Sequence, residues 1–156
     1  MKITKETLIK YTKLITIYTL SILYIIVGWK HFVNPDFFIA IMPPFIPLHK
    51  ACVFITGFLE ILFGTLMLFN KTRTIGAWGI IVVLILVFPA NIYLYVSEIP
   101  QELLNISKTQ ALIRMPFQIP LIMIAYWHSI KQQEDKLLSY ICIILFIPTI
   151  LYFINL

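Results

Sequence analysis

The sequence predicts an all-α integral membrane protein, a bundle of helices that crosses the bilayer several times. Hydrophobic residues make up 60% of the 156 residues and charged residues only 12%, and the mean hydropathy is +0.93. This apolar content is too high for an ordinary soluble domain. The apolar residues also form long runs, each near the ~20 residues that a helix needs to cross ~30 Å of hydrocarbon. Because lipid cannot satisfy backbone N–H and C=O groups, these runs must be helical, and they are too long and too uniformly apolar for barrel strands.

Five predicted spans follow one another along the chain, so we expect one transmembrane domain over residues 1–156. Their approximate limits are 14–33, 51–69, 75–96, 111–130 and 137–154. The first run is too long for a signal-peptide core and no small-residue cleavage site follows it, so it is expected to remain as a signal anchor. The five spans use roughly 95 residues at about 19 each, which leaves no room for a separate catalytic domain.

Two of the connections between spans are unusual. The segment 34–50 contains four prolines, which prevent a continuous helix, yet it is strongly apolar. We expect a short interfacial or re-entrant cap there, or else a plain loop whose aromatic residues anchor at the headgroups. The segment 97–110 is polar and carries Glu98, Glu102 and Lys108, so it should be solvated.

The distribution of basic residues predicts the orientation of the chain. The side that holds the N-terminus has eight: Lys2, Lys5, Lys10, Lys13, Lys71, Arg73, Lys131 and Lys136. The other side has four: Lys30, Lys50, Lys108 and Arg114. The positive-inside rule then places the N-terminus in the cytoplasm and, with five spans, the C-terminus outside. The net charge of +5 should therefore meet an anionic lipid leaflet and not nucleic acid.

Glu60 is the most informative polar residue, because it lies at the middle of the second span. A carboxylate there costs roughly 2.5 to 3.5 kcal/mol on insertion scales. Keeping the group neutral at pH 7 costs about 3.7 kcal/mol, so these magnitudes leave its protonation state open. Gly57 and Gly64 flank it on one helical face, where a neighbouring backbone can approach closely. Glu60 therefore serves either structural hydrogen bonding or a functional site.

Other polar residues are predicted in the outer half of the bilayer. They are Lys30 and His31 at the end of the first span, Asn91 after Pro89 in the third, and Arg114 and Gln118 one turn apart in the fourth. Pro89 frees a carbonyl and kinks its helix beside Asn91. Glu60, roughly 15 Å below the outer end of its helix, would form the floor of a pocket that opens outward. The alternative is a buried polar network that only fixes the helix register.

The sequence shows no evident haem, metal or nucleotide site. Its three histidines lie at unmatched depths for a bis-histidine haem, and no His/Cys cluster suits zinc. Neither a Gly-rich phosphate loop nor a Ser/His/Asp set is present. Cys52 and Cys142 lie inside apolar runs without metal-ligand spacing, so we expect buried hydrophobic residues and not a redox pair.

Five short motifs resemble the DoxX-like family of small bacterial multi-span membrane proteins. They are GWKHFVNP (28–35) with Phe38 and Pro43, TGFLEILFG (56–64), TRTIGAWG (72–79), FPANIY (88–93) and RMPFQ (114–118). The resemblance implies a four-helix membrane bundle that serves as the membrane component of redox systems, including quinone-linked ones. The family-like positions would be His31, Pro35, Glu60, Asn91, Arg114 and Gln118. The fifth apolar run departs from the four-helix pattern; it would cover the side of the bundle or mediate self-association.

We therefore expect a multi-pass protein of the bacterial plasma membrane with an outward polar pocket for a small amphipathic molecule, such as a quinone. Glu60 would accept or donate a proton, Arg114 and Lys30 would hold an anionic or carbonyl oxygen, and Asn91 and Gln118 would orient it. The partners would be the lipid bilayer and either an oxidoreductase subunit or a second copy of the chain, since no side chain here carries electrons. Two other classes stay open: a small proton-coupled permease or exporter with Glu60 as proton carrier, and an assembly factor without a ligand.

Overall fold

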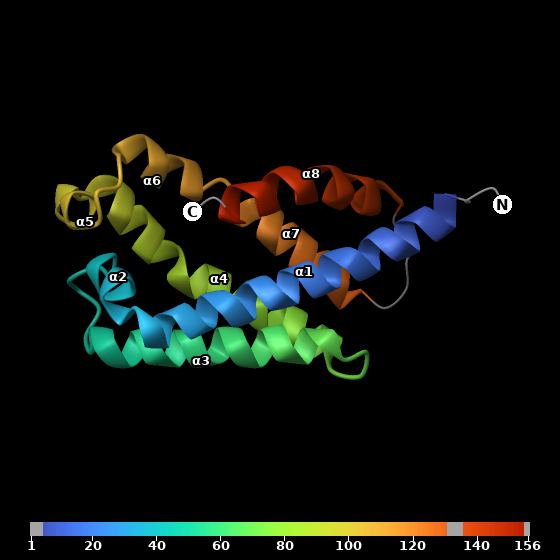
Figure 1. Cartoon of the computed structure of the whole chain (residues 1–156), viewed down its shortest axis with the longest axis horizontal. Helices are drawn as coiled ribbons and strands as arrows, with labels where there is room; N and C mark the ends of the chain where they lie inside the picture. Colours follow the sequence, from blue (N-terminus) through green and yellow to red (C-terminus); the bar gives the residue numbers. More distant parts are fainter. Residues whose placement is uncertain (1–4, 131–135, 155–156) are drawn as a thin grey trace.

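The structure, a computed structural model, describes residues 5–130 and 136–154. Within these ranges every regular element is a helix, which confirms the predicted all-α class. The helices are α1 (Lys5–Val33), α2 (Pro35–Ala40), α3 (His49–Leu68), α4 (Arg73–Val96), α5 (Glu98–Leu104), α6 (Lys108–Arg114), α7 (Gln118–Ser129) and α8 (Lys136–Ile154) (Figure 1). Lys2 and Lys131, which entered the charge count, lie outside the described residues.

Three helices in the described part of the chain are long and apolar enough to cross a membrane: α1, from Thr7 on, α3 and α4. Their positions agree with the first three predicted spans. The apolar stretch Lys136–Tyr152 of α8 is shorter, and α7 has 12 residues. The composition of α1, α3 and α4 therefore supports a membrane-embedded protein.

The fourth predicted span, 111–130, differs from the expectation because it is not one helix. It is divided into the end of α6 and the whole of α7 by a turn at residues 115–117. Pro116 has no N–H to donate to the Leu112 carbonyl, so the helical ladder is interrupted there. The Leu112 carbonyl instead accepts a hydrogen bond from the N–H of Met115, three residues further on, at 3.3 Å. As a result Arg114 ends one helix and Gln118 begins the next.

Glycines bring α1 and α3 into close contact. A Cβ added at Gly28 would lie only 2.6 Å from the carbonyl oxygen of Gly57, and one added at Gly57 would lie 2.5 Å from the Cβ of His31. At Gly64 the nearest atom would be the carbonyl oxygen of Ser21, at 3.0 Å. The predicted small-residue face on either side of Glu60 is therefore confirmed, and its partner is α1.

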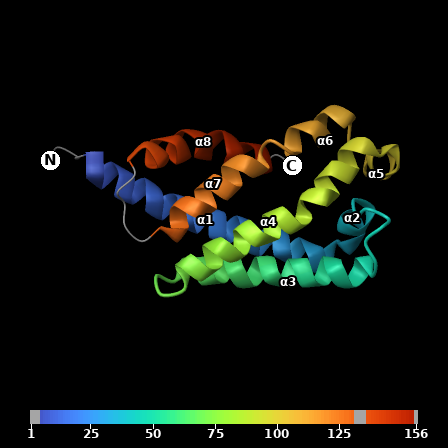
Figure 2. The same ribbon diagram turned by 180° about the vertical axis from the view of Figure 1, so that it is seen from behind.

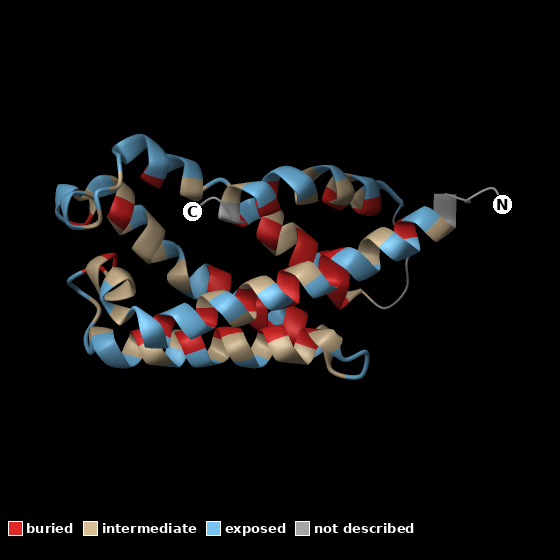
Figure 3. Ribbon diagram, in the orientation of Figure 1, coloured by how far each residue is buried: buried red, intermediate tan, exposed pale blue. Residues whose placement is uncertain are grey.

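The main apolar core lies where α1, α3, α4, α7 and α8 meet. Leu20, Ile80, Ile124 and Trp127 are among its members, and each is at most 2% exposed. Apolar residues on the outer faces remain exposed, among them Ile15, Ile22, Ile26, Ile55, Phe58, Val82 and Ile85. Figure 3 shows buried positions gathered where the helices cross and exposed positions on their outer surfaces. An outer surface of this kind is what lipid contact requires.

A second small core closes one end of the bundle. Ile41, Leu94 and Ala111 are buried there, with Phe37 of α2 packed against them. The segment 34–50 thus contains a short helix, α2, that contacts α1, α3 and α5. In the segment 97–110, the side chains of Glu98 and Glu102 are exposed as expected, but the helix α5 was not foreseen. Figures 1 and 2 show α2 and α5 at the same end of the molecule.

Candidate functional site

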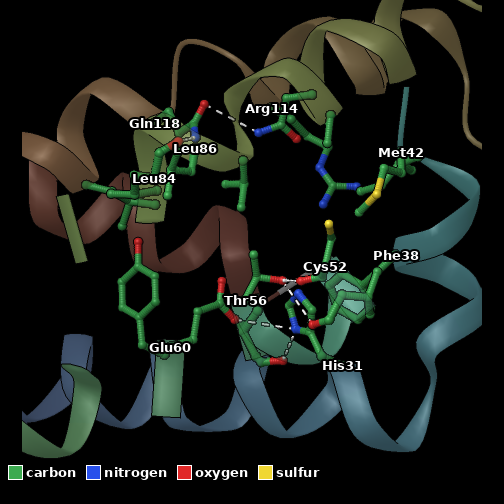
Figure 4. A pocket seen from close by; sticks show the side chains of 18 of the residues that line it. His31, Phe38, Met42, Cys52, Thr56, Glu60, Leu84, Leu86, Arg114 and Gln118 are labelled. Carbon is green, nitrogen blue, oxygen red and sulfur yellow. Dashed lines mark hydrogen bonds and ion pairs between the residues drawn. The ribbon is translucent and has the colours of Figure 1, made fainter. Parts of the chain in front are cut away.

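A cavity of about 320 Å³ lies at the end of the molecule that α2 covers. Its lining comes from six helices, α1, α2, α3, α4, α6 and α7, and from the turn after α2. Most of the wall is apolar. Polar side chains reach it from five helices: His31, Glu60, Asn91, Arg114 and Gln118. These are five of the six site residues that the sequence predicts, and Figure 4 shows Arg114 and Gln118 on the wall opposite His31 and Glu60.

The structure does not bring Lys30 to the cavity. Its side chain is exposed, and it is not among the lining residues, whereas the next residue, His31, is buried and lines the wall. Successive residues of an α-helix point about 100° apart, and here that rotation turns Lys30 to the exposed face of α1. The predicted role of Lys30 at the rim is therefore not supported by its position.

Glu60 and His31 face each other across the contact between α1 and α3. Glu60 is only 5% exposed, and its Oε2 lies 3.4 Å from Nδ1 of His31. The same Nδ1 lies 2.9 Å from the carbonyl oxygen of Val27, one turn earlier in α1. A carbonyl can only accept, so Nδ1 carries a hydrogen and donates it there. The proton that His31 can gain or lose is therefore the one on Nε2.

An aromatic contact fixes the orientation of the His31 ring. Phe38 of α2 stacks on it with 3.5 Å between ring centroids and 20° between planes. The bond to Val27 and this stack together hold the ring from two sides. His31 is thus positioned by α1 and α2, while Glu60 is supplied by α3 (Figure 4).

Two side-chain amides connect α4 and α7 at the opposite wall. Gln118 donates from Nε2 to the carbonyl oxygen of Leu84 at 2.7 Å, and its Oε1 accepts from Nδ2 of Asn91 at 3.3 Å. Pro89 lies between these two α4 residues and has no N–H for the helical ladder. Membrane helices tolerate such an interruption where neighbouring polar side chains bond the backbone. Pro89 leaves the carbonyl of Ile85 without its helical donor. Gln118 bonds the carbonyl of the preceding residue, Leu84.

Arg114 is the cation at the cavity. Its Cζ lies 5.6 Å from the centre of the Phe37 ring, within the range of a cation–π contact. Among the described residues the ion pair at this site is His31 with Glu60, and Arg114 is not paired with a carboxylate. Its guanidinium donors therefore keep capacity for an oxygen atom inside the cavity.

Sequence reasoning missed several residues that line the cavity: Tyr24, Phe38, Cys52 and Thr56. Helical spacing was the signal that could have found three of them. Cys52 and Thr56 precede Glu60 by two turns and one turn, and Tyr24 precedes His31 by two turns, so each lies on the face of a residue already singled out. Phe38 had no such signal, because its position depends on how α2 folds against α1.

Two buried oxygen atoms at the cavity have no hydrogen-bond partner. They are the hydroxyl oxygen of Tyr24 and Oε2 of Glu60. Buried polar groups are nearly always bonded, and an unsatisfied one costs about 1–3 kcal/mol. Two in one cavity indicate a place where water or a ligand supplies the missing bonds.

A metal centre is not indicated at this cavity. No group of three or more His, Cys, Asp or Glu residues that could hold a metal ion occurs in the described ranges. Cys52 and Cys142 are free cysteines, on α3 and α8 respectively. The arrangement can instead hold an uncharged or anionic oxygen and exchange a proton with it.

The fold and composition define an all-helical protein whose three long apolar helices are compatible with a membrane. The chain belongs to the family described as Domain of unknown function (DUF8561), whose model matches residues 20–129. The five predicted polar residues that line the cavity fall within the matched residues, whereas α8 lies beyond them. The comparison with curated proteins and the comparison with solved structures each gave no match.

Proposed function

We propose that this chain is a multi-pass protein of the bacterial plasma membrane that binds a small amphipathic molecule in the cavity. The observation that carries the proposal is the convergence of five polar side chains, each from a different helix, on a cavity whose wall is otherwise mostly apolar. Ligand sites commonly combine an apolar wall with a few placed polar groups that fix orientation. The apolar wall suits the body of the molecule, and the polar groups suit its head.

In the proposed arrangement α1, α3, α4 and the α6–α7 pair form a four-helix core, and α8 is a fifth span at its side. Support comes from the packing, since α8 contacts α7 and α1. The N-terminus would be cytoplasmic and the C-terminus and the cavity on the outer side. A reporter fused after residue 156 tests this: activity on the outer side is expected, and cytoplasmic activity contradicts five spans with this orientation.

A quinone-like ligand fits the groups present, and the resemblance to the DoxX-like family points the same way. Arg114 would donate to a carbonyl or anionic oxygen, and Asn91 and Gln118 would orient it. Glu60 would pass a proton to or from that oxygen. A bound quinone supplies two-electron, two-proton chemistry. Since none of the lining side chains carries electrons, an oxidoreductase subunit would be the second partner.

Copurification tests the proposal directly. The protein is extracted from its own membranes in a mild detergent, and the molecules that remain bound are identified by mass spectrometry. We expect a lipid-soluble molecule with one polar head, at a fixed ratio to the chain, and its loss in Glu60→Gln. Glu102→Gln removes the same charge from an exposed position and should retain it.

Two results would contradict the proposal. One is a wild-type protein without any bound molecule other than bulk lipid. The other is a Glu60→Gln chain that no longer folds, judged by its circular dichroism and thermal unfolding; Glu60 would then serve helix packing, as in an assembly factor without a ligand.

A proton-coupled permease is the second candidate, favoured by the buried carboxyl of Glu60, whose Oε2 accepts no hydrogen bond. It predicts uptake or efflux by proteoliposomes that depends on a proton gradient and disappears in Glu60→Gln. Retention of one molecule without gradient-dependent flux favours the binding function instead.

A further inference from the structure

A second, larger pocket lies at the opposite end of the helices from the cavity described above. Its volume is about 720 Å³. It is formed by the first turns of α1, the connection between α3 and α4, the start of α4 and the end of α7. The residues that line it are Thr7, Lys10, Tyr11, Lys13, Leu14, Ile17, Asn70, Arg73, Thr74, His128 and Ile130. None of these lining residues is acidic.

Three permanent cations, Lys10, Lys13 and Arg73, share this pocket, although they come from two different helices. Hydrogen bonds hold two of them in place. Nζ of Lys13 donates to the carbonyl oxygen of Ile130 at 3.2 Å, and Nε of Arg73 donates to that of Met67 at 3.1 Å. Both bonds use backbone acceptors, and within residues 5–130 and 136–154 no described carboxylate forms an ion pair with either side chain. Like charges gathered in this way repel one another unless an anion joins them.

His128 provides the second, independent observation. Its side chain is 2% exposed and lines the pocket, yet neither Nδ1 nor Nε2 has a hydrogen-bond partner. The ring packs on Trp127 with 5.3 Å between centroids, which fixes its position. A neutral imidazole always carries one N–H, so His128 has a donor with no acceptor. An oxygen atom in the pocket would supply that acceptor.

We infer that this pocket, which we call the basic pocket, binds a phosphate group. Three cations and a buried histidine donor surround one space, and together they match the charge and the acceptor oxygens of phosphate. The source is either the headgroup of an anionic phospholipid or free phosphate. Basic pockets between membrane helices on the cytoplasmic side are suited to anionic headgroups, and this end is the cytoplasmic one in the proposed orientation.

Native mass spectrometry of the purified full chain tests the lipid source, with phosphatidylglycerol and phosphatidylcholine of identical acyl chains offered together. Titration with inorganic phosphate in phosphatidylcholine nanodiscs tests the free anion. We expect preferential retention of phosphatidylglycerol. Binding of inorganic phosphate without lipid preference would also support the basic pocket and assign the free anion as its ligand.

Substitutions separate the basic pocket from general surface attraction. Lys10→Gln and Lys13→Gln should each weaken binding by about fivefold. His128→Phe keeps an aromatic ring against Trp127 but removes both nitrogens, and should weaken binding by about fivefold. Lys71→Gln is the matched control: it removes one charge from an exposed residue at the same end of the molecule that does not line the pocket.

Two results would overturn the inference. One is equal retention of the two lipids together with no binding of phosphate. The other is a loss in Lys71→Gln as large as that in the pocket variants. Lys10 is exposed, so its substitution leaves the fold intact and keeps the test decisive even if Lys13→Gln or His128→Phe fails to fold. None of these substituted residues lines the cavity around Glu60. Failure of the phosphate inference is therefore distinguishable from failure of the proposed function.

Discussion

The Nδ1 atom of His31 lies 3.4 Å from Oε2 of Glu60 and 2.9 Å from the carbonyl oxygen of Val27. Nδ1 therefore faces two oxygen atoms and forms its hydrogen bond with the closer one, the backbone carbonyl. Glu60 is left with an oxygen that has no hydrogen-bond partner, beside a cavity. The pair is thus unlike a closed salt bridge that merely joins two helices, since its acidic member keeps a lone pair for a third group.

The contact between α1 and α3 should tolerate no side chain at Gly57. Gly57→Ala would place a methyl group 2.5 Å from the Cβ of His31, so we expect a loss of roughly 1–3 kcal/mol in the free energy of unfolding. Gly64→Ala meets its nearest atom at 3.0 Å and should cost less. Thermal unfolding in detergent measures both. Wild-type stability of Gly57→Ala would show that Gly57 does not set the approach of α1 and α3.

The amide bridge between α4 and α7 should act as a unit. Gln118→Leu removes the bond to the Leu84 carbonyl and leaves Nδ2 of Asn91 without its acceptor, at a cost of about 1–3 kcal/mol. Asn91→Leu in the Gln118→Leu background should then cost less than in the wild type, because the shared bond is already gone. Exposed Ile119→Leu on α7 is the control. Strict additivity of the two losses would contradict the bridge.

Arg114 should matter for ligand retention far more than other basic residues at the same end. Arg114→Gln removes the charged donors at the cavity and is expected to reduce retention by about tenfold. Lys30→Gln and Lys50→Gln remove the same charge from exposed positions outside the cavity and should leave retention unchanged. Quantitative mass spectrometry of copurified molecules measures all three. A loss in Lys30→Gln equal to that in Arg114→Gln would restore the rim role that its sequence position suggested.

Cys52 should report on occupancy of the cavity. It is half-buried and lines the cavity, whereas Cys142 is fully buried in the apolar core. We expect a membrane-permeant maleimide to label Cys52 first, and a bound molecule to slow that labelling. Cys52→Ser should abolish the fast phase, and Cys142→Ser should preserve it. Fast labelling that survives in Cys52→Ser would mean that the thiol does not face an accessible space.

Much of the fold follows from local rules. Long apolar helices are evident from composition, so both limits of α3 and α4 and the end of α1 are predicted closely, whereas α1 begins at Lys5, before the predicted start at residue 14. A hydropathy profile does not detect a three-residue turn inside an apolar run, however. The break at residues 115–117 was therefore not predicted, although Pro116 is its cause. The helix α5 was not predicted because the polar composition of the segment 97–110 favoured a loop.

The candidate site was predictable where a buried polar group must have a polar partner. Glu60 needs a polar partner from another helix of the bundle. The glycines around it indicate which face of α3 a neighbouring helix approaches. Lys30 is predicted at the pocket because it is next to His31 in the sequence, but in the helix its side chain is exposed and does not line the cavity. Phe38 and Tyr24 acquire their roles from tertiary packing. The hydroxyl of Tyr24 becomes notable only when burial leaves it unsatisfied.

The tight seam at Gly28 and Gly57 also has a mechanical consequence. Backbones in direct contact cannot slide or part without losing their packing, so α1 and α3 form a stiff wall that carries His31 and Glu60. We therefore expect a ligand to enter by movement of the facing wall. There α6 is a short helix with non-helical residues on each side, and Arg114 is its last residue. Arg114 would then move relative to Glu60 while Glu60 stays in place.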